Sequence, residues 1–390
     1  MIMREIAITL YLAVFSIIFK LSQWFPLENK VTFVVSFSEN NKSIYKEMIR
    51  QDLSCRTLFL TTEKMYSSFS KLEKSTTLLF EMKRPIDFLR SIYHLATSKI
   101  IFVDNYYGFL AKSNFKPGVE CIQLWHANGA IKKFGLKDPS IKSRSEKAIQ
   151  RFHTVYQRFS TVVVGSDAMT DIYKQAFGIN DKRMVRTGIP RTDVFFDQSI
   201  KKKAEEKLKK NHPFLENKKV ILYAPTYRED ELIDAKLNLD LKKMADRFDE
   251  DYILLLKLHP AIKNRFEIPS DLSEFIYDFS NNPSMNEMLF ITDILITDYS
   301  SIPFEYTLLN RPVIFYLYDL EDYKSERGVW DGFLEYLPGP IAENTDDIIR
   351  LIEENSFDSE RIHSFADKWN QYSKGQSSRN VVDLVKGLLK

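Results

Sequence analysis

The segment from Asp293 to Glu305 places hydroxyl groups and a carboxylate between a predicted strand and a predicted helix. Ile294 to Thr297 is apolar and β-prone, Asp298 to Ser301 is short and polar, and Pro303 suits the first position of a helix. The unpaired N–H groups and partial positive charge of a helix start can hold an anion, and adjacent hydroxyls add donors. We predict a phosphate site here, with an ordinary helix cap as the alternative.

A histidine follows another predicted strand. His126 comes directly after Glu120 to Trp125, and Asn128-Gly129 supplies a tight turn before Lys132 and Lys133. A histidine at a strand end can take a proton from an attacking hydroxyl, because its pKa lies near neutrality. A hydrogen-bonded structural histidine is the alternative, and the glycine turn and paired lysines favour the functional interpretation.

A second strand-end histidine lies in the other half of the chain. His259 ends the predicted strand Asp251 to Leu258, and Lys257 precedes it. Two such histidines, one in each half, could face one substrate, although a capped strand end is the alternative. Arg228 also follows a predicted strand and could pair with a phosphate through two hydrogen bonds, or form a surface ion pair.

Several common cofactor and nucleophile motifs are missing from the sequence. There is no GxGxxG, no Walker lysine loop and no GxSxG elbow. No residue cluster has zinc spacing, and Asp249-Glu-Asp251 precedes a predicted strand rather than following one. We therefore expect no metal and no cofactor, and we expect phosphate binding by backbone, hydroxyl and basic groups.

The elements that would position these residues alternate between strand and helix. Their apolar runs are continuous, as in parallel sheets with both faces covered. The chain has 390 residues, more than one core usually supports, and the charged segment Lys201 to Lys210 separates two similar halves. We predict an α/β fold of two doubly wound Rossmann-like domains facing a cleft, with residues that follow strands near the ligand.

Composition narrows the class of protein. The 55 basic and 53 acidic residues give a net charge of +2, which offers no general case for nucleic-acid binding. The two cysteines, Cys55 and Cys121, make no disulfide scaffold and suggest a reducing cytoplasm.

The amino-terminal segment is strongly apolar. Ile6 to Phe19 is nearly unbroken apolar sequence, and Lys20 and Trp24 follow it. About 20 residues are needed to cross a bilayer, so this run is short. It fits a helix lying at a membrane surface, and a buried first helix of the domain is the alternative.

Five motifs occur together in a fixed order. They are Trp125 to Gly135, Thr187 to Asp193, Ala224 to Arg228, Leu258 to Pro260, and Thr297 to Glu305. The set resembles the CDP-glycerol:glycerophosphate glycerophosphotransferases of Gram-positive wall teichoic acid synthesis. The resemblance implies a GT-B-like fold, with the donor bound mainly in the second domain, in a peripheral enzyme at the cytoplasmic face of the membrane.

The resemblance also implies domain bounds and residue roles. It suggests a membrane-association helix at 1–27, an acceptor-side domain at 28–200, a CDP-glycerol domain at 215–350, and a helical tail at 351–390 that packs back on the first domain. The implied catalytic pair is His126 and His259. The implied donor and phosphate contacts are Thr297, Asp298, Ser300, Ser301, Glu305, Arg228 and Lys257. The implied acceptor-side residues are Asn128, Gly129, Lys132 and Lys133.

The expected reaction is transfer of glycerol phosphate from CDP-glycerol to an undecaprenyl-diphosphate-linked disaccharide or its glycerol-phosphate adduct, with release of CMP. The size of the chain is that of a primase or a short-adding transferase. His126 is the expected base, although the two histidines could exchange roles. The alternatives are a transferase of similar fold that uses UDP-sugars or CDP-ribitol, and a non-catalytic membrane scaffold.

Overall fold

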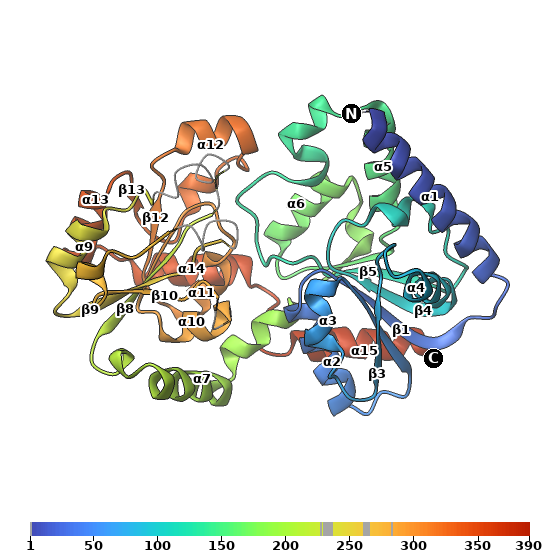
Figure 1. The fold of residues 1–390 in the computed structure, drawn as a ribbon, viewed down its shortest axis with the longest axis horizontal. Helices are drawn as coiled ribbons and strands as arrows, with labels where there is room; N and C mark the ends of the chain where they lie inside the picture. The colour runs from blue at the N-terminus through green and yellow to red at the C-terminus, as the bar shows by residue number, and fades with distance from the viewer. Residues whose placement is uncertain (1, 227, 229–236, 260–265, 282–283) are drawn as a thin grey trace. The chain divides into compact units, whose positions relative to one another are not determined.

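The computed structural model describes residues 2–226, 228, 237–259, 266–281 and 284–390. By internal contacts the chain divides into two units. Unit 1 comprises Met1–Ala127, Phe134–Asp193 and Gln371–Lys390, and unit 2 comprises Asn128–Lys133 and Val194–Asn370. Each unit is built on its own sheet (Figure 1). The predicted α/β class with two parallel sheets is confirmed.

Unit 1 contains a seven-stranded parallel sheet in the order β3-β2-β1-β4-β5-β6-β7. Its strands are β1 (Glu28–Val35), β2 (Arg56–Thr61), β3 (Ser75–Leu79), β4 (Ser98–Val103), β5 (Glu120–Gln123), β6 (Thr161–Val163) and β7 (Met184–Val185). Its helices are α1 (Ile2–Ser22), α2 (Glu39–Arg50), α3 (Glu63–Phe69), α4 (Pro85–Thr97), α5 (Glu146–Gln157), α6 (Asp167–Phe177) and α15 (Ser377–Leu389). The order reverses between β1 and β4, which is where a doubly wound sheet usually binds its ligand.

Unit 2 contains a six-stranded parallel sheet in the order β10-β9-β8-β11-β12-β13. Its strands are β8 (Lys219–Ala224), β9 (Tyr252–Leu256), β10 (Ile276–Asp278), β11 (Ile294–Thr297), β12 (Val313–Tyr316) and β13 (Ile341–Ala342). Its helices are α7 (Gln198–Asn211), α9 (Leu241–Phe248), α10 (Met285–Ile291), α11 (Pro303–Tyr306), α12 (Leu320–Arg327), α13 (Thr345–Glu353) and α14 (Ser359–Trp369). The charged segment Lys201 to Lys210, which was expected to separate the two halves, lies in α7. This helix packs against α10 and belongs to unit 2.

The sheet interiors explain why the apolar runs read as continuous. In β4 and β8 nearly every residue is buried, since helices cover both faces. In unit 1, α2 and α15 pack on one face through a cluster that contains Val31, Phe33, Ile100 and Val385. Helix α4 lies on the other face of that sheet (Figure 1). Apolar patterning did not predict β3 and β13, which lie at sheet edges and have few fully buried residues.

Helix α1 has two apolar faces. Leu12, Phe15 and Phe19 are buried in unit 1, and Tyr11 contacts Phe88 of α4 at 6.0 Å between ring centroids. The opposite face exposes apolar side chains, among them Ile6, Leu10, Ile17 and Leu21. Glu5–Ser22 is long and apolar enough to cross a membrane by length and composition alone. The helix therefore docks on the domain while it keeps an exposed apolar stripe.

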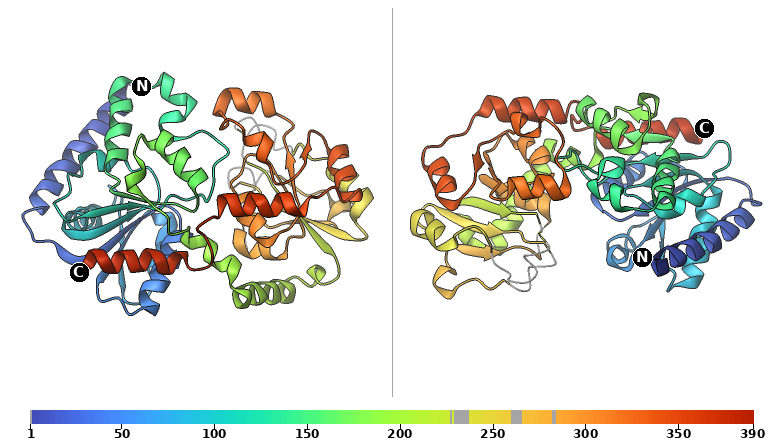
Figure 2. Two further views of the ribbon diagram at one scale, coloured as in Figure 1. Left: turned by 180° about the vertical axis from the view of Figure 1, so that it is seen from behind. Right: turned by 90° about the horizontal axis from the view of Figure 1, so that it is seen from above.

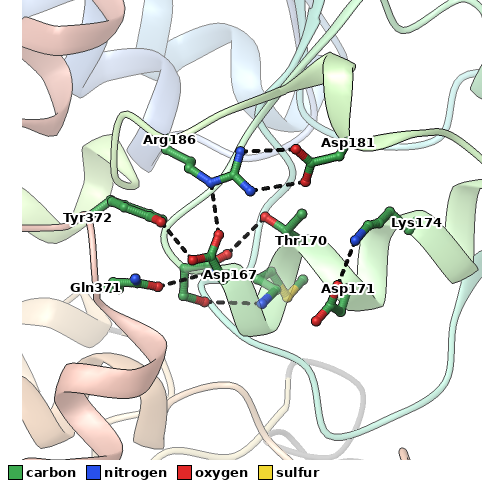
Figure 3. Close-up of polar contacts among 10 residues, drawn as sticks. Asp167, Thr170, Asp171, Lys174, Asp181, Arg186, Gln371 and Tyr372 are labelled. Carbon is green, nitrogen blue, oxygen red and sulfur yellow. Dashed lines mark hydrogen bonds and ion pairs between the residues drawn. The ribbon is translucent and has the colours of Figure 1, made fainter.

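The chain returns to unit 1 at its C-terminal end. Helix α14 belongs to unit 2, whereas α15 packs against α2 and β4 of unit 1 (Figure 2). Polar contacts fasten the start of the returning segment. Gln371 accepts a hydrogen bond from the Asp167 amide, and the Tyr372 hydroxyl donates to the Asp167 carboxylate, which also pairs with Arg186 (Figure 3).

Candidate active site

A strained turn sets the position of His126 after β5. Trp125 has φ +54°, a left-handed conformation that is unusual for a bulky residue. Two hydrogen bonds hold it: its amide donates to Gln123 Oε1 at 2.8 Å, and its carbonyl accepts from Asn40 Nδ2 at 3.0 Å. Backbone strain of this kind persists only where the surroundings enforce it, and it is frequent at functional sites.

The imidazole of His126 is held in its neutral form. Its Nδ1 lies 3.2 Å from the main-chain carbonyl of Asp104, and because a carbonyl can only accept, Nδ1 carries the hydrogen. Nε2 therefore keeps its lone pair. The ring stacks on Phe37 at 4.3 Å and on Trp125 at 4.5 Å. Burial lowers the pKa of His126 to about 4, so the ring is neutral at pH 7.

Asp104 organises the loop that covers His126. Its carboxylate accepts hydrogen bonds from the amides of Ser36 and Phe37, from Asn41 Nδ2 and from the Tyr107 hydroxyl. Burial raises the pKa of this carboxyl to about 6, against the effect of those donors. At pH 7 the carboxylate is ionised, which suits neighbours that are all hydrogen-bond donors. Its bond to the Phe37 amide holds the main chain that carries the Phe37 ring.

The motif Thr187 to Asp193 supports the same loop. Arg191 donates from Nη1 to the His126 carbonyl at 2.8 Å, and its amide donates to Asn40 Oδ1 at 2.9 Å. At the end of the motif, Asp193 accepts from the amides of Ser377 and Ser378, the first residues of α15. The motif thus joins the His126 turn to the returning C-terminal helix.

Unit 2 contains a pocket of about 550 Å³ at the ends of β8 and β9. It is lined by Lys132, Ala224, Pro225, Thr226, Lys257, Leu258, His259, Ser280, Met285, Ser300, Ile302, Tyr323 and Arg327. This described lining has three cations and a histidine and contains no carboxylate. Such a surface attracts an anion and fits a phosphate or diphosphate group.

The residues Asn128–Lys133, which follow His126 closely, belong to unit 2. Asn128 is fully buried and donates to Asn370 Oδ1, and a Cβ on Gly129 would lie 2.1 Å from the Phe304 ring. Lys132 reaches the pocket, and Lys133 pairs with Asp331 at 3.3 Å. The structure therefore buries Asn128, packs Gly129 against Phe304 and brings Lys132 to the pocket of His259, and the predicted acceptor-side roles of these residues stay predictions.

Two residues of the predicted phosphate turn, Thr297 and Asp298, are buried and hydrogen-bond to the chain around Ala224 and Thr226. Thr297 is buried and donates to the Ala224 carbonyl, and Asp298 is buried and accepts from the Thr226 amide. Arg228 pairs with Asp298 at 3.0 Å and with Asp319 at 2.7 Å. The geometry favours a bracing role for these three residues, and their predicted phosphate contacts stay predictions. Tyr227 and Pro260, which complete two of the motifs, lie outside the described residues.

The helix predicted to follow the phosphate turn is short. Helix α11 has four residues, so the aligned dipoles that would favour an anion are few. Ser300 lines the pocket, and its Oγ accepts from the Ile302 amide. Ser301 is half-buried beside it, and Glu305 is buried. Charge at this pocket therefore comes from side chains, including Lys257, more than from the helix terminus.

The sequence motifs did not predict several residues of this pocket. Arg327 ends α12 and Tyr323 lies one turn before it, outside the five motifs. A basic residue directly before Gly328 at a helix end was the available signal. Among the described residues, no group of three or more His, Cys, Asp and Glu side chains is arranged to hold a metal ion.

The chain is similar over most of its length to known proteins. Residues 17–387 match the family model described as CDP-Glycerol:Poly(glycerophosphate) glycerophosphotransferase. The chain is 36% identical to a teichoic acid glycerol-phosphate primase of Bacillus subtilis, across 99% of both chains. It is 35% identical to a teichoic acid poly(ribitol-phosphate) polymerase of Bacillus spizizenii, across 89% of this chain and 56% of that one.

A solved structure shares the fold. The wall teichoic acid polymerase TagF superposes with a TM-score of 0.80 at 22% identity, across 99% of this chain and 98% of that one. At this identity the likeness establishes the fold alone, an α/β architecture with two parallel sheets.

Proposed function

Since this chain belongs to the CDP-glycerol:poly(glycerophosphate) glycerophosphotransferase family and is a transferase of that class, we propose that it acts as a primase. It would transfer glycerol phosphate from CDP-glycerol to an undecaprenyl-diphosphate-linked disaccharide and release CMP. The near full-length similarity to a glycerol-phosphate primase supports this choice over a polymerising role.

The observation that carries the proposal is the pocket of unit 2. Lys132, Lys257, Arg327 and His259 line it, and its described lining has no carboxylate. A nucleoside diphosphate donor carries two phosphates that need such compensation, and charge on the leaving CMP grows during transfer. The cations stabilise that charge most strongly in the transition state.

The chemistry follows from the two histidines. An acceptor hydroxyl attacks the β-phosphorus of CDP-glycerol in line, and His126 Nε2 takes its proton. The new bond joins the acceptor oxygen to phosphorus, and the bond from that phosphorus to the oxygen bridging the two phosphates breaks. That oxygen leaves with CMP. His259 contributes on the donor side, where it lines the pocket.

The exposed face of α1 supports peripheral attachment to the cytoplasmic face of the membrane. Ile6 is 61% exposed on this helix and Lys20 is also exposed, and Trp24, which follows the helix, is 84% exposed, so apolar side chains and a cation are exposed along α1 and just after it. An amphipathic surface of this kind binds at the level of the headgroups and upper acyl chains. A lipid-linked acceptor would be available there.

The first test is transfer from labelled CDP-glycerol to a lipid-linked disaccharide analogue. His126→Ala is expected to lower turnover by about 10²- to 10⁴-fold, the usual contribution of a general base. His153→Ala, at an exposed position on α5, is the matched control. Near wild-type turnover in His126→Ala would reject the assignment of the base.

The second test addresses the donor pocket. Lys132→Met is expected to raise the KM for CDP-glycerol about tenfold, because one charge-assisted contact is lost. Lys133→Met changes the neighbouring lysine, which pairs with Asp331, and should have little effect on that KM. Equal effects of the two variants would contradict the pocket assignment.

A donor screen separates the alternatives. CDP-glycerol, CDP-ribitol and UDP-sugars are compared as donors, since both glycerol and ribitol enzymes occur among the relatives. Product masses from the disaccharide lipid and from its glycerol-phosphate adduct then distinguish a primase from a subsequent-unit transferase. Binding without CMP release for every donor and acceptor would indicate a scaffold.

A further inference from the structure

A second large pocket lies in unit 1. It has a volume of about 850 Å³ and lies between α1 and the segment formed by the short helix η3 (Pro139–Ser143) and α5. The wall formed by α1 is mainly apolar, with Ile6, Ile8, Leu10 and Ala13 beside Glu5 and Thr9, and the other wall carries Arg144, Lys147 and Arg151. We call this pocket the α1–α5 groove.

The apolar wall is fixed in an exposed position. Leu12, Phe15 and Phe19 bury the opposite face of α1 in unit 1, so Ile6 and Leu10 cannot turn inward without undocking the helix. Ile6 is 61% exposed and Leu10 66% exposed. A contiguous apolar surface of this kind on a docked helix indicates an interaction site.

The opposite wall contains an ion pair to α1 and two exposed cations. Arg151 pairs with Glu5 through two hydrogen bonds of 3.1 and 3.2 Å, which ties α5 to α1. Arg144 lies over the Phe152 ring and donates to Ser140 Oγ, and Lys147 donates to Thr9 Oγ1. Phe152, Ser140 and Thr9 are neutral, so these contacts leave the charges of Arg144 and Lys147 uncompensated.

We propose that the α1–α5 groove binds one phospholipid with an anionic headgroup. The acyl chain lies along Ile6, Leu10 and Ala13, and the phosphate is held by Arg144 and Lys147. A soluble phosphate would not need the apolar wall, and an uncharged lipid would not need the cations.

This inference rests on the proposed membrane attachment and narrows it from general adsorption to a lipid site of defined stoichiometry. The consequence is a preference for anionic over zwitterionic lipid that depends on two named cations. General adsorption through the α1 face would instead depend on total apolar area and on overall charge.

The test uses the full-length protein and short-chain phosphatidylglycerol below its critical micelle concentration, followed by titration calorimetry and native mass spectrometry. One lipid should bind per chain, and phosphatidylcholine with the same acyl chains should bind about tenfold more weakly. The double variant Arg144→Gln/Lys147→Gln should lose this preference. Lys137→Gln/Lys142→Gln removes two exposed charges outside the groove lining and should keep it.

A groove-filling variant separates this inference from the proposed function. Ala13→Trp puts an indole into the exposed groove and should abolish binding of the short-chain lipid, while CMP release with a water-soluble acceptor analogue stays unchanged. Absent or non-saturable binding, equal binding of the two lipids, or equal losses in the two double variants would overturn the lipid site. Tighter binding of a short prenyl phosphate would reassign the groove to a lipid carrier.

Discussion

At the scale of single residues, contacts with the main chain decide what His126 can do. The Asp104 carbonyl selects the tautomer, and the rings of Phe37 and Trp125 exclude water from the imidazole. The sequence showed that a histidine follows a strand, but it could not show that Phe37 and Asp104 contact it, because they follow the distant strands β1 and β4. A tautomer with a free Nε2 lone pair is a consequence of the tertiary fold.

The first prediction concerns pH. The proposed base must be neutral to accept a proton, so its protonation should remove activity as the pH drops through the pKa of His126, which burial lowers to about 4. The acidic limb of kcat/KM should therefore lie well below pH 6.5, the usual value for histidine. Phe37→Ser removes one covering ring and should move that limb upward, because desolvation is reduced. A wild-type limb at 6.5, unchanged in Phe37→Ser, would refute this account.

At the scale of elements, strand order and helix ends differ in how well sequence patterns predict them. Continuous apolar runs located most buried strands, since burial on both faces leaves a direct mark on composition. The short length of α11 could not be predicted from the composition of its segment. The membership of Asn128–Lys133 in unit 2 also could not be predicted, because it depends on contacts with Phe304 and Asn370, distant in sequence.

The second prediction tests that membership. In Gly129→Ala the new Cβ would meet the Phe304 ring at 2.1 Å, so either the ring or the segment must shift. Overpacking of this kind costs about 1–3 kcal/mol, and we expect a lower free energy of unfolding and a higher KM for the donor, because Lys132 lies on the same segment. Both are measured by denaturant unfolding and steady-state kinetics.

The controls for this prediction come from the same chain. Gly387→Ala adds a Cβ in open space within α15 and should be neutral or slightly stabilising. Phe304→Leu combined with Gly129→Ala should recover part of the loss, since a smaller side chain makes room. No difference between Gly129→Ala and Gly387→Ala would show that the close approach to Phe304 has no energetic consequence.

At the scale of the whole molecule, the chain leaves unit 1 and returns to it. The sequence predicted two α/β halves and a helical tail, because periodic apolar patterns mark both. The sequence could not predict that this tail divides between the units, with α14 in unit 2 and α15 in unit 1. The Asp193 carboxylate accepts hydrogen bonds from the first two amides of α15, and the Ile189 amide donates to Ser373 Oγ. One loop of unit 1 therefore holds the returning segment.

The last prediction follows from this return. Val385 of α15 is fully buried in the cluster that contains Ile44, Val31 and Ile100, so Val385→Ser leaves a cavity and buries a hydroxyl. We expect about 2–4 kcal/mol of destabilisation, confined to unit 1. Hydrogen exchange followed by mass spectrometry should show faster exchange in β1, β4 and α2, with β8 and β11 unchanged. Asp383→Ser, at an exposed position on the same helix, should alter neither set, and uniform acceleration across both sheets would instead mean that the two units unfold together.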